Sequence, residues 1–177
     1  MRGLASETLS DFELRAIGTI IVNFTDLDFA AGHLLMGFIG GDATWTLVAG
    51  EDISWKLDKL SVIADEHLTD ERARGFLRDW VRASRMLVER RNQLIHAFYM
   101  IADGDEATSR WKVSTRGGRW KGHREPVVLD HLTEFADLLA QGWDAAQEVE
   151  EQLRACPEWH NISGPVAPAS DSPAGSA

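Results

Sequence analysis

Cysteine is almost absent from this sequence, and no segment has the composition that directs a protein to or across a membrane. The single thiol, Cys156, cannot close an intramolecular disulfide. The longest uncharged stretch between acidic residues, 29–41, is too short to span a bilayer. Glu7, Asp11 and Glu13 occupy the N-terminal region, where a secretory signal needs an apolar run. We therefore expect a cytoplasmic protein without a membrane span.

Length and composition favour one folded domain. The chain has 177 residues, of which 44% are apolar and 26% are charged, a balance typical of soluble globular proteins. There are 18 lysines and arginines against 28 aspartates and glutamates, so the formal net charge is −10. Taken over the whole chain, this charge argues against a nucleic-acid partner, because phosphates would be repelled.

The charge, however, is distributed unevenly along the chain. Residues 1–71 and residues 125–177 each carry a balance of −9, whereas residues 72–124 hold 13 basic and 5 acidic side chains, a balance of +8. Trp111 and Trp120 lie among these cations. Basic residues interleaved with aromatic ones can bind phosphates and stack on bases. Alternatively, the cations pair with acidic helices of the same chain or across a dimer interface.

Most of the chain shows the spacing of apolar residues by three and four that is typical of amphipathic helices. A capping box at Ser10–Glu13 predicts the start of a long helix that ends at Gly40-Gly41. The same pattern predicts a short turn at 42–48 and further helices at 53–64, from 70 to about 102, and from 132 to 153. The sequence therefore predicts an all-α fold with four main helices.

The convincing strand signal lies before the last helix, at about 110–124. Gly117-Gly118 joins two β-compatible runs, which favours a hairpin with a two-residue turn. With this turn, Arg116 faces Arg119, and one face of the hairpin is cationic. The cations of that face are candidate RNA-binding residues, together with Arg85 of the preceding helix: Lys112, Arg116, Arg119, Lys121 and His123.

The helices and the hairpin together define the predicted domain. Residues 1–9 form an N-terminal tail, and residues 10–156 form the helical bundle with its hairpin insertion. Residues 157–177 are rich in proline, serine, glycine and alanine, so they are expected to form a disordered tail.

Arg91 has an unusual position on the third long helix. On a helical wheel it falls on the apolar face, whereas Arg85, Asn92 and His96 lie within about 40° of one another on a polar stripe. A buried guanidinium needs an acid or several carbonyls, and Asp28 interrupts the apolar stripe of the first helix. We therefore predict an Asp28–Arg91 pair in which Asp28 orients the other donors of Arg91. Alternatively, this pair only fixes the register of the two helices.

The segment 89–96, ERRNQLIH, resembles the signature of the HEPN superfamily. That signature is an arginine, commonly followed by a polar residue such as asparagine, and then a histidine after a short spacer. The matching residues are Arg91, Asn92 and His96. Similar proteins are all-α bundles with a polar or acidic residue in the first long helix, as Asp28 is here, and with the motif on a later helix. The resemblance covers roughly residues 10–155 and implies a HEPN-like bundle.

The resemblance further implies metal-independent cleavage of RNA, often in toxin–antitoxin, abortive-infection or CRISPR-linked defence systems, with two motifs meeting in a homodimer cleft. His96 would act as general base or acid, Arg91 would hold the phosphate, and Asn92 would hydrogen-bond the phosphate or the sugar. No cofactor is implied, and no spacing of histidine and cysteine matches a metal site. The implied partners are RNA, a second copy of the chain, and a cognate antitoxin or another partner protein.

Two other interpretations of the same residues stay open. Some proteins that keep the motif act only as binding or scaffold modules, which would make this chain a non-catalytic helical interaction module. An antitoxin-like or regulatory protein that binds RNA without cutting it is the other interpretation. In a subset of the superfamily, a partner nucleotidyltransferase modifies a tyrosine two residues after the histidine. Here that position is Phe98, so this form of regulation is not expected.

Overall fold

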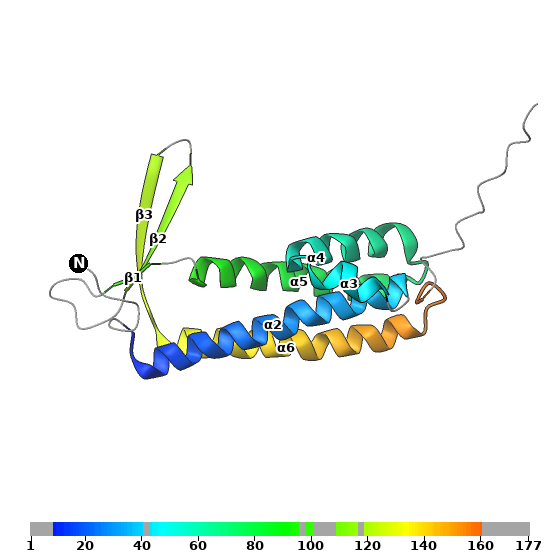
Figure 1. Ribbon diagram of the computed structural model, residues 1–177, viewed down its shortest axis with the longest axis horizontal. Helices are drawn as coiled ribbons and strands as arrows, with labels where there is room; N and C mark the ends of the chain where they lie inside the picture. Colours follow the sequence, from blue (N-terminus) through cyan, green and yellow to red (C-terminus); the bar gives the residue numbers. More distant parts are fainter. Residues whose placement is uncertain (1–8, 41–42, 96–97, 101–108, 117–118, 161–177) are drawn as a thin grey trace, which may run out of the picture.

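The computed structural model describes residues 9–40, 43–95, 98–100, 109–116 and 119–160. They form a bundle of helices that run along one long axis, with a small three-stranded sheet at one end (Figure 1). This mostly helical architecture confirms the predicted all-α class at its coarsest level. Within the described residues, no helix is long and apolar enough to cross a membrane.

The first long helix, α2, spans Asp11–Ile39 and begins at the predicted capping box. The backbone N–H of Ser10 donates to the Glu13 carboxylate (2.7 Å), and Ser10 Oγ accepts from the backbone N–H of Glu13 (3.3 Å). The helix ends at Gly40, whose φ of 70° is a conformation that glycine adopts without strain. Both ends of α2 are therefore set by local residues that the sequence reveals.

A short helix and a longer one follow α2. They are α3 (Ala43–Ala49) and α4 (Ile53–Val62), and α4 continues into a single π-helical turn, η1 (Ile63–His67). Asp52 caps α4 by accepting from the backbone N–H of Trp55 at 2.9 Å. Ile53, Leu57 and Leu60 of α4 are buried, and α4 packs against both α2 and α5.

The helix that carries the predicted motif, α5, spans Glu71–Ile95 and is shorter than the sequence indicates. Asp70 caps its start by accepting from the backbone N–H of Ala73 at 2.8 Å. The predicted helix continues to about 102, but Phe98–Met100 form a strand, β1, instead. Apolar and aromatic residues in so short a run fit a helix and a strand equally well. Pairing with a neighbouring strand therefore decides which of the two forms.

The sheet has the strand order β1-β2-β3, and both pairs of strands are antiparallel. The strands β2 (Ser109–Arg116) and β3 (Arg119–Pro126) pair with Arg116 opposite Arg119, the register that a two-residue connection requires. Gly117-Gly118 lies outside the described residues. The strand β1 pairs with the start of β2, with Phe98 opposite Trp111. The early end of α5 thus supplies a third strand that the sequence analysis does not predict.

The last helix, α6, spans Leu129–Arg154 and lies beside α2 (Figure 1). Asn23 Nδ2 of α2 donates to the carbonyl of Ala136, and Trp80 Nε1 of α5 donates to the carbonyl of Gly142, both at 2.9 Å. The core between the helices contains completely or almost completely buried side chains, including Leu27, Phe38, Leu57, Leu77, Phe135 and Leu139. Each such side chain contributes about 1.5–3 kcal/mol on burial, so packing holds the bundle together.

After α6 the chain folds back onto the end of α2, so the predicted tail at 157–177 begins too early. Trp159 is 7% exposed and packs edge-on against Phe38, with ring centroids 4.9 Å apart. The backbone N–H of His160 donates to the carbonyl of Gly37 at 2.8 Å. The predicted boundary is wrong for residues 157–160. The composition of the segment is typical of a tail, but it includes Trp159, whose large side chain can be buried. Residues 161–177 lie outside the described part of the chain.

Glu158, in the same turn, forms hydrogen bonds to the segment that precedes α5. Its Oε1 accepts from the backbone N–H of Thr69 at 3.0 Å and from the Thr69 hydroxyl at 2.5 Å. The hydroxyl bond is the main reason why the pKa of Glu158 lies below its ordinary value of 4.5. The native state therefore favours the ionised carboxylate.

We expect this contact to give the free energy of unfolding a distinct pH dependence. Because the pKa of Glu158 is lower in the native state, its contribution is present above about pH 4.5 and is lost as the pH falls through the native pKa. Thr69→Val removes the hydroxyl donor, so it should destabilise the protein more at about pH 7 than at about pH 3. Chemical denaturation at both pH values measures the difference. Thr25→Val, which removes an exposed hydroxyl bonded within its own helix, should show no such trend.

Candidate functional site

The last turns of α5 hold the arginine and the asparagine of the predicted motif. Arg91 is half-buried, and its guanidinium lies over the ring of Phe24 in α2, 4.5 Å from the ring centroid. The negative face of an aromatic ring stabilises a cation in this position. Arg91 Nη1 also donates to Oδ1 of the adjacent Asn92 at 3.1 Å. The two residues therefore form one polar unit at the point where α5 ends.

These contacts do not satisfy the whole guanidinium of Arg91. Its Nε is buried, and among the described residues this atom has no hydrogen-bond partner. A buried donor without an acceptor costs about 1–3 kcal/mol. A group that carries such a cost in a folded protein calls for a functional explanation, which makes Arg91 the strongest site candidate on α5.

The predicted pair between Asp28 and Arg91 is wrong. Asp28 instead accepts from Lys56 Nζ of α4 at 2.8 Å, and Lys56 is only 3% exposed. The ammonium of Lys56 is buried more deeply than the guanidinium of Arg91, so leaving it without a carboxylate would cost more free energy. Arg91 is stabilised by the Phe24 ring. Asp28 therefore links α2 to α4 and does not orient the guanidinium of Arg91.

The third residue of the motif, His96, lies outside the described residues. The helix α5 ends at Ile95, and the description resumes at Phe98. The structure thus brings Arg91 and Asn92 together and separates Asp28 from both. The role of His96 stays a prediction from the spacing of the motif.

The candidate RNA-binding residue Arg85 points toward α4 and takes part in an ion pair. Its Nη2 donates to Asp58 at 2.7 Å, and Arg78 pairs with Asp65 of η1 at 2.6 Å. All four side chains are about half exposed or more, so each pair contributes less than about 1 kcal/mol. The pairs nevertheless neutralise part of the positive charge of α5 within the chain.

The other candidate RNA-binding residues belong to β2 and β3. Residues that lie directly opposite one another share a face of a sheet. The register places Lys112 opposite His123, Ser114 opposite Lys121, and Arg116 opposite Arg119. The register therefore assigns all five candidates to the same face. The sheet lies at the end of the bundle where α5 ends (Figure 1), so Arg91, Asn92 and the cationic strands are at the same end of the molecule.

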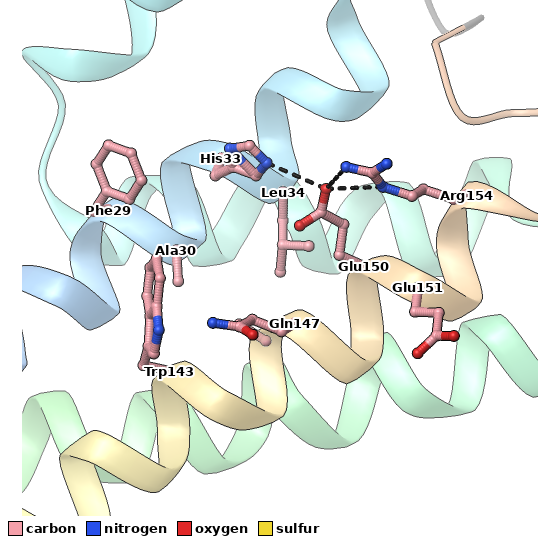
Figure 2. A pocket seen from close by; sticks show the side chains of 10 residues that line it. Phe29, Ala30, His33, Leu34, Trp143, Gln147, Glu150, Glu151 and Arg154 are labelled. Atoms are coloured by element: carbon pink, nitrogen blue, oxygen red, sulfur yellow. Dashed lines mark hydrogen bonds and ion pairs between the residues drawn. The ribbon is translucent and has the colours of Figure 1, made fainter.

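A second polar cluster lies in a hollow between α2 and α6 that the sequence analysis does not predict (Figure 2). Glu150 is the central residue of this cluster. The Oε1 atom of Glu150 lies 3.2 Å from His33 Nε2 and accepts from Nε and Nη2 of Arg154 at 3.0 and 2.7 Å. Phe29 and Trp143 form an aromatic wall, with ring centroids 6.0 Å apart. The hollow has a volume of about 490 Å³.

The sequence indicates only one of the two contacts that form this cluster. Glu150 and Arg154 are four residues apart, a spacing that brings side chains together on a helix. His33 is 117 positions away from Glu150, and only the packing of α2 on α6 brings it there. Because Glu150 is paired with Arg154, its charge is already compensated. The cluster therefore acts as a polar link between two helices.

The histidines, cysteine and acids of the described residues do not gather into a metal-binding group of three or more. Burial raises the pKa of the Cys156 thiol, and the nearby carboxylates of Asp70 and Glu158 raise it further. The thiol therefore stays protonated near neutral pH, which makes it a poor nucleophile and a poor metal ligand.

Comparison with known proteins identifies no relative of this chain. No protein-family model matches it, and no curated protein or solved structure matches it either.

Proposed function

We propose that the protein is a metal-independent endoribonuclease with a HEPN-like bundle, acting as a toxin or as another component of a defence system. One observation carries the proposal: the Arg91–Asn92 unit at the end of α5 adjoins the sheet whose register gathers cationic residues on one face. A basic surface of this kind would attract the RNA backbone. RNA that lies along the sheet would bring a phosphate to the end of α5.

The proposed reaction is attack of a ribose 2′-hydroxyl on the adjacent phosphate. His96 accepts the proton of the 2′-hydroxyl, a new P–O2′ bond forms, and the P–O5′ bond breaks as a proton is returned to the leaving 5′-oxygen. Arg91 stabilises the charge that develops on the phosphoryl oxygens. Asn92 holds Arg91 through the 3.1 Å bond and offers its amide to the phosphate or sugar. The products are a 2′,3′-cyclic phosphate and a 5′-hydroxyl.

The purified protein should therefore cut RNA in the presence of EDTA. His96→Ala is expected to lower the cleavage rate by about 10²–10⁴-fold, the usual contribution of general acid–base catalysis. Arg91→Lys keeps the charge but loses the forked donors, whereas Arg91→Ala loses both, so the rate should fall in that order. Gel electrophoresis of structured and unstructured RNA, with identification of the product ends, measures these effects.

Arg82→Ala is the matched control for these variants. Arg82 lies on the same helix in an exposed pair with Asp79 at 3.0 Å, so its removal should leave the cleavage rate unchanged. A substrate with 2′-deoxyribose in place of ribose should stay intact, because it lacks the nucleophile. Equal cleavage by wild type and His96→Ala would refute the proposed mechanism.

The ion pairs of α5 favour a second candidate, a non-catalytic helical interaction or RNA-binding module. Arg78 and Arg85 are already bonded to acidic residues of η1 and α4, so these two cations serve the fold. Such a module would bind RNA or an acidic partner without turnover, and the binding would weaken steeply with salt. RNA binding without products in the EDTA assay would select this second candidate.

A further inference from the structure

The arginines along α5 are held in two different ways. Four of them pair with carboxylates of α5, η1 or α4: Arg74, Arg78, Arg82 and Arg85. The last two contact aromatic rings instead. The guanidinium of Arg90 lies over the ring of Phe135 in α6, 4.7 Å from the ring centroid. Arg91 lies over Phe24 of α2 in the same manner. In the part of the chain that the structure describes, neither of these two arginines pairs with a carboxylate.

An aromatic ring fixes a guanidinium without neutralising it. The ring has no net charge, and it does not occupy the forked N–H donors as a carboxylate does. Arg90 is exposed, and within the described residues its N–H groups donate to no acceptor. Arg90 therefore offers its whole charge and its donors to an anion, whereas the paired arginines of α5 do not.

A small pocket of about 70 Å³ lies beside Arg90, between the end of α5 and the start of α6. Arg90 and His131 are the lining residues with ionisable side chains, and both can donate an N–H. The other lining residues are Leu94, Leu132, Phe135 and the segment 126–128, which joins β3 to α6. A water molecule occupies about 30 Å³ in the liquid. The pocket can therefore admit a compact group of a few atoms, such as a phosphate, but not a nucleobase.

The acids nearest in sequence to His131 do not reverse the charge of this pocket. Asp130 and Glu134 are both exposed, and neither is among the residues that line it. Neither of them forms an ion pair with Arg90. The side chains that line the pocket thus carry the positive charge of Arg90 and no negative charge.

We propose that this pocket is a phosphate-binding subsite, which holds a phosphate group of the RNA strand next to the one that reacts at Arg91. Arg90 donates to the phosphate while the Phe135 ring holds its guanidinium in place, and His131 donates from α6. Neighbouring residues of a helix point about 100° apart, so a strand that crosses the end of α5 meets both arginines. The subsite rests on the proposed function, because it takes RNA as the ligand. It assigns a role to Arg90 and His131, which neither the motif nor the hairpin pattern predicts.

Binding of an oligonucleotide that cannot be cut tests the subsite separately from catalysis. The probe is a fluorescent single strand with 2′-deoxyribose throughout, and its anisotropy is measured at several salt concentrations. Arg90→Ala should weaken binding by about threefold to tenfold and reduce the slope of log K against log salt by about 0.7, the value for one phosphate contact of a single strand. Arg90→Lys keeps the charge, so it should keep most of the slope. His131→Ala removes one donor and should also weaken binding.

Arg72→Ala is the matched control. Arg72 belongs to the same helix and also lies over an aromatic ring, 5.6 Å from the centroid of Phe76. It lies 18 positions before Arg90 and therefore about 27 Å away along the helix. Its removal takes away the same charge but should leave the slope unchanged. The proposal is overturned if the wild type does not bind the probe, or if Arg90→Ala weakens binding no more than Arg72→Ala does.

Probes with and without a 5′-phosphate identify which phosphate the pocket holds. If Arg90→Ala weakens binding of both probes equally, the pocket binds a phosphodiester of the chain. If the loss is confined to the 5′-phosphorylated probe, the pocket binds a terminal phosphate. Either result supports a phosphate subsite.

Cleavage assays with the same variants separate the subsite from the proposed ribonuclease activity. Arg90→Ala should raise KM about threefold to tenfold and leave kcat close to the wild-type value, because the phosphate in the pocket does not react. If the wild type binds the probe but cuts no RNA, the ribonuclease proposal fails, and a weaker binding by Arg90→Ala still supports the subsite. If the wild type cuts RNA while Arg90→Ala keeps both its KM and its affinity for the probe, only the subsite is refuted.

Discussion

Asp28→Ala is expected to destabilise the protein by about 3–5 kcal/mol, because it leaves the ammonium of Lys56 buried without a counter-charge. Lys56 is 3% exposed, and its Nζ lies 2.8 Å from Asp28 Oδ1. Within the described residues, Asp28 is the one carboxylate that pairs with Lys56. Urea denaturation, followed by the fluorescence of the seven tryptophans, measures the loss of unfolding free energy.

Lys56→Met separates the buried charge from the packing of its stem. It removes the ammonium but keeps a side chain of similar length, and the remaining Asp28 side chain is 34% exposed, so water can solvate it. We therefore expect a change of about 1 kcal/mol or less, and we expect Lys56→Met to rescue most of the loss in Asp28→Ala. Asp58→Ala removes an exposed pair with Arg85 and should cost less than about 1 kcal/mol. A similarly small cost for Asp28→Ala would contradict the buried pair.

The Asp28–Lys56 pair also shows where prediction from the sequence stops. On helical wheels Asp28 and Arg91 fall among the apolar residues of their helices, which agrees with the partial burial of both side chains. A wheel represents one helix only, whereas the neighbouring helix α4 supplies Lys56, whose buried ammonium pairs with Asp28. Which charges meet depends on how three helices pack, and this information is not contained in the periodicity of any one of them.

Local sequence patterns, in contrast, are sufficient to predict the structure where the interacting residues are close in sequence. The Ser10–Glu13 box fixes the start of α2, and a two-residue connection fixes the register of β2 on β3. The end of α5 at Ile95 and the strand Phe98–Met100 depend on the partner strand, which begins only at Ser109. For the candidate site, the sequence predicted Arg91 and Asn92 as neighbours, but not the Phe24 ring on which Arg91 lies.

Gly37→Ala should destabilise the protein by about 2–4 kcal/mol, although alanine is the better helix former by about 1 kcal/mol. Gly37 lies inside α2, and a Cβ added there would come within 2.1 Å of Cζ2 of Trp159. Non-bonded heavy atoms do not approach so closely, so the indole must leave its place against Phe38. The loss of a buried tryptophan costs about 3–5 kcal/mol, and the gain in helix propensity offsets only part of it.

Gly18→Ala is the matched control, because Gly18 lies in the same helix and an added Cβ would meet nothing within 4 Å. It should stabilise the protein by about 0.5–1 kcal/mol. The decisive comparison repeats Gly37→Ala in a Trp159→Ala background. There the added methyl group meets no ring, so the substitution should become neutral or stabilising. Because only the clash depends on the indole, an equal loss in both backgrounds would show that Trp159 is not the cause.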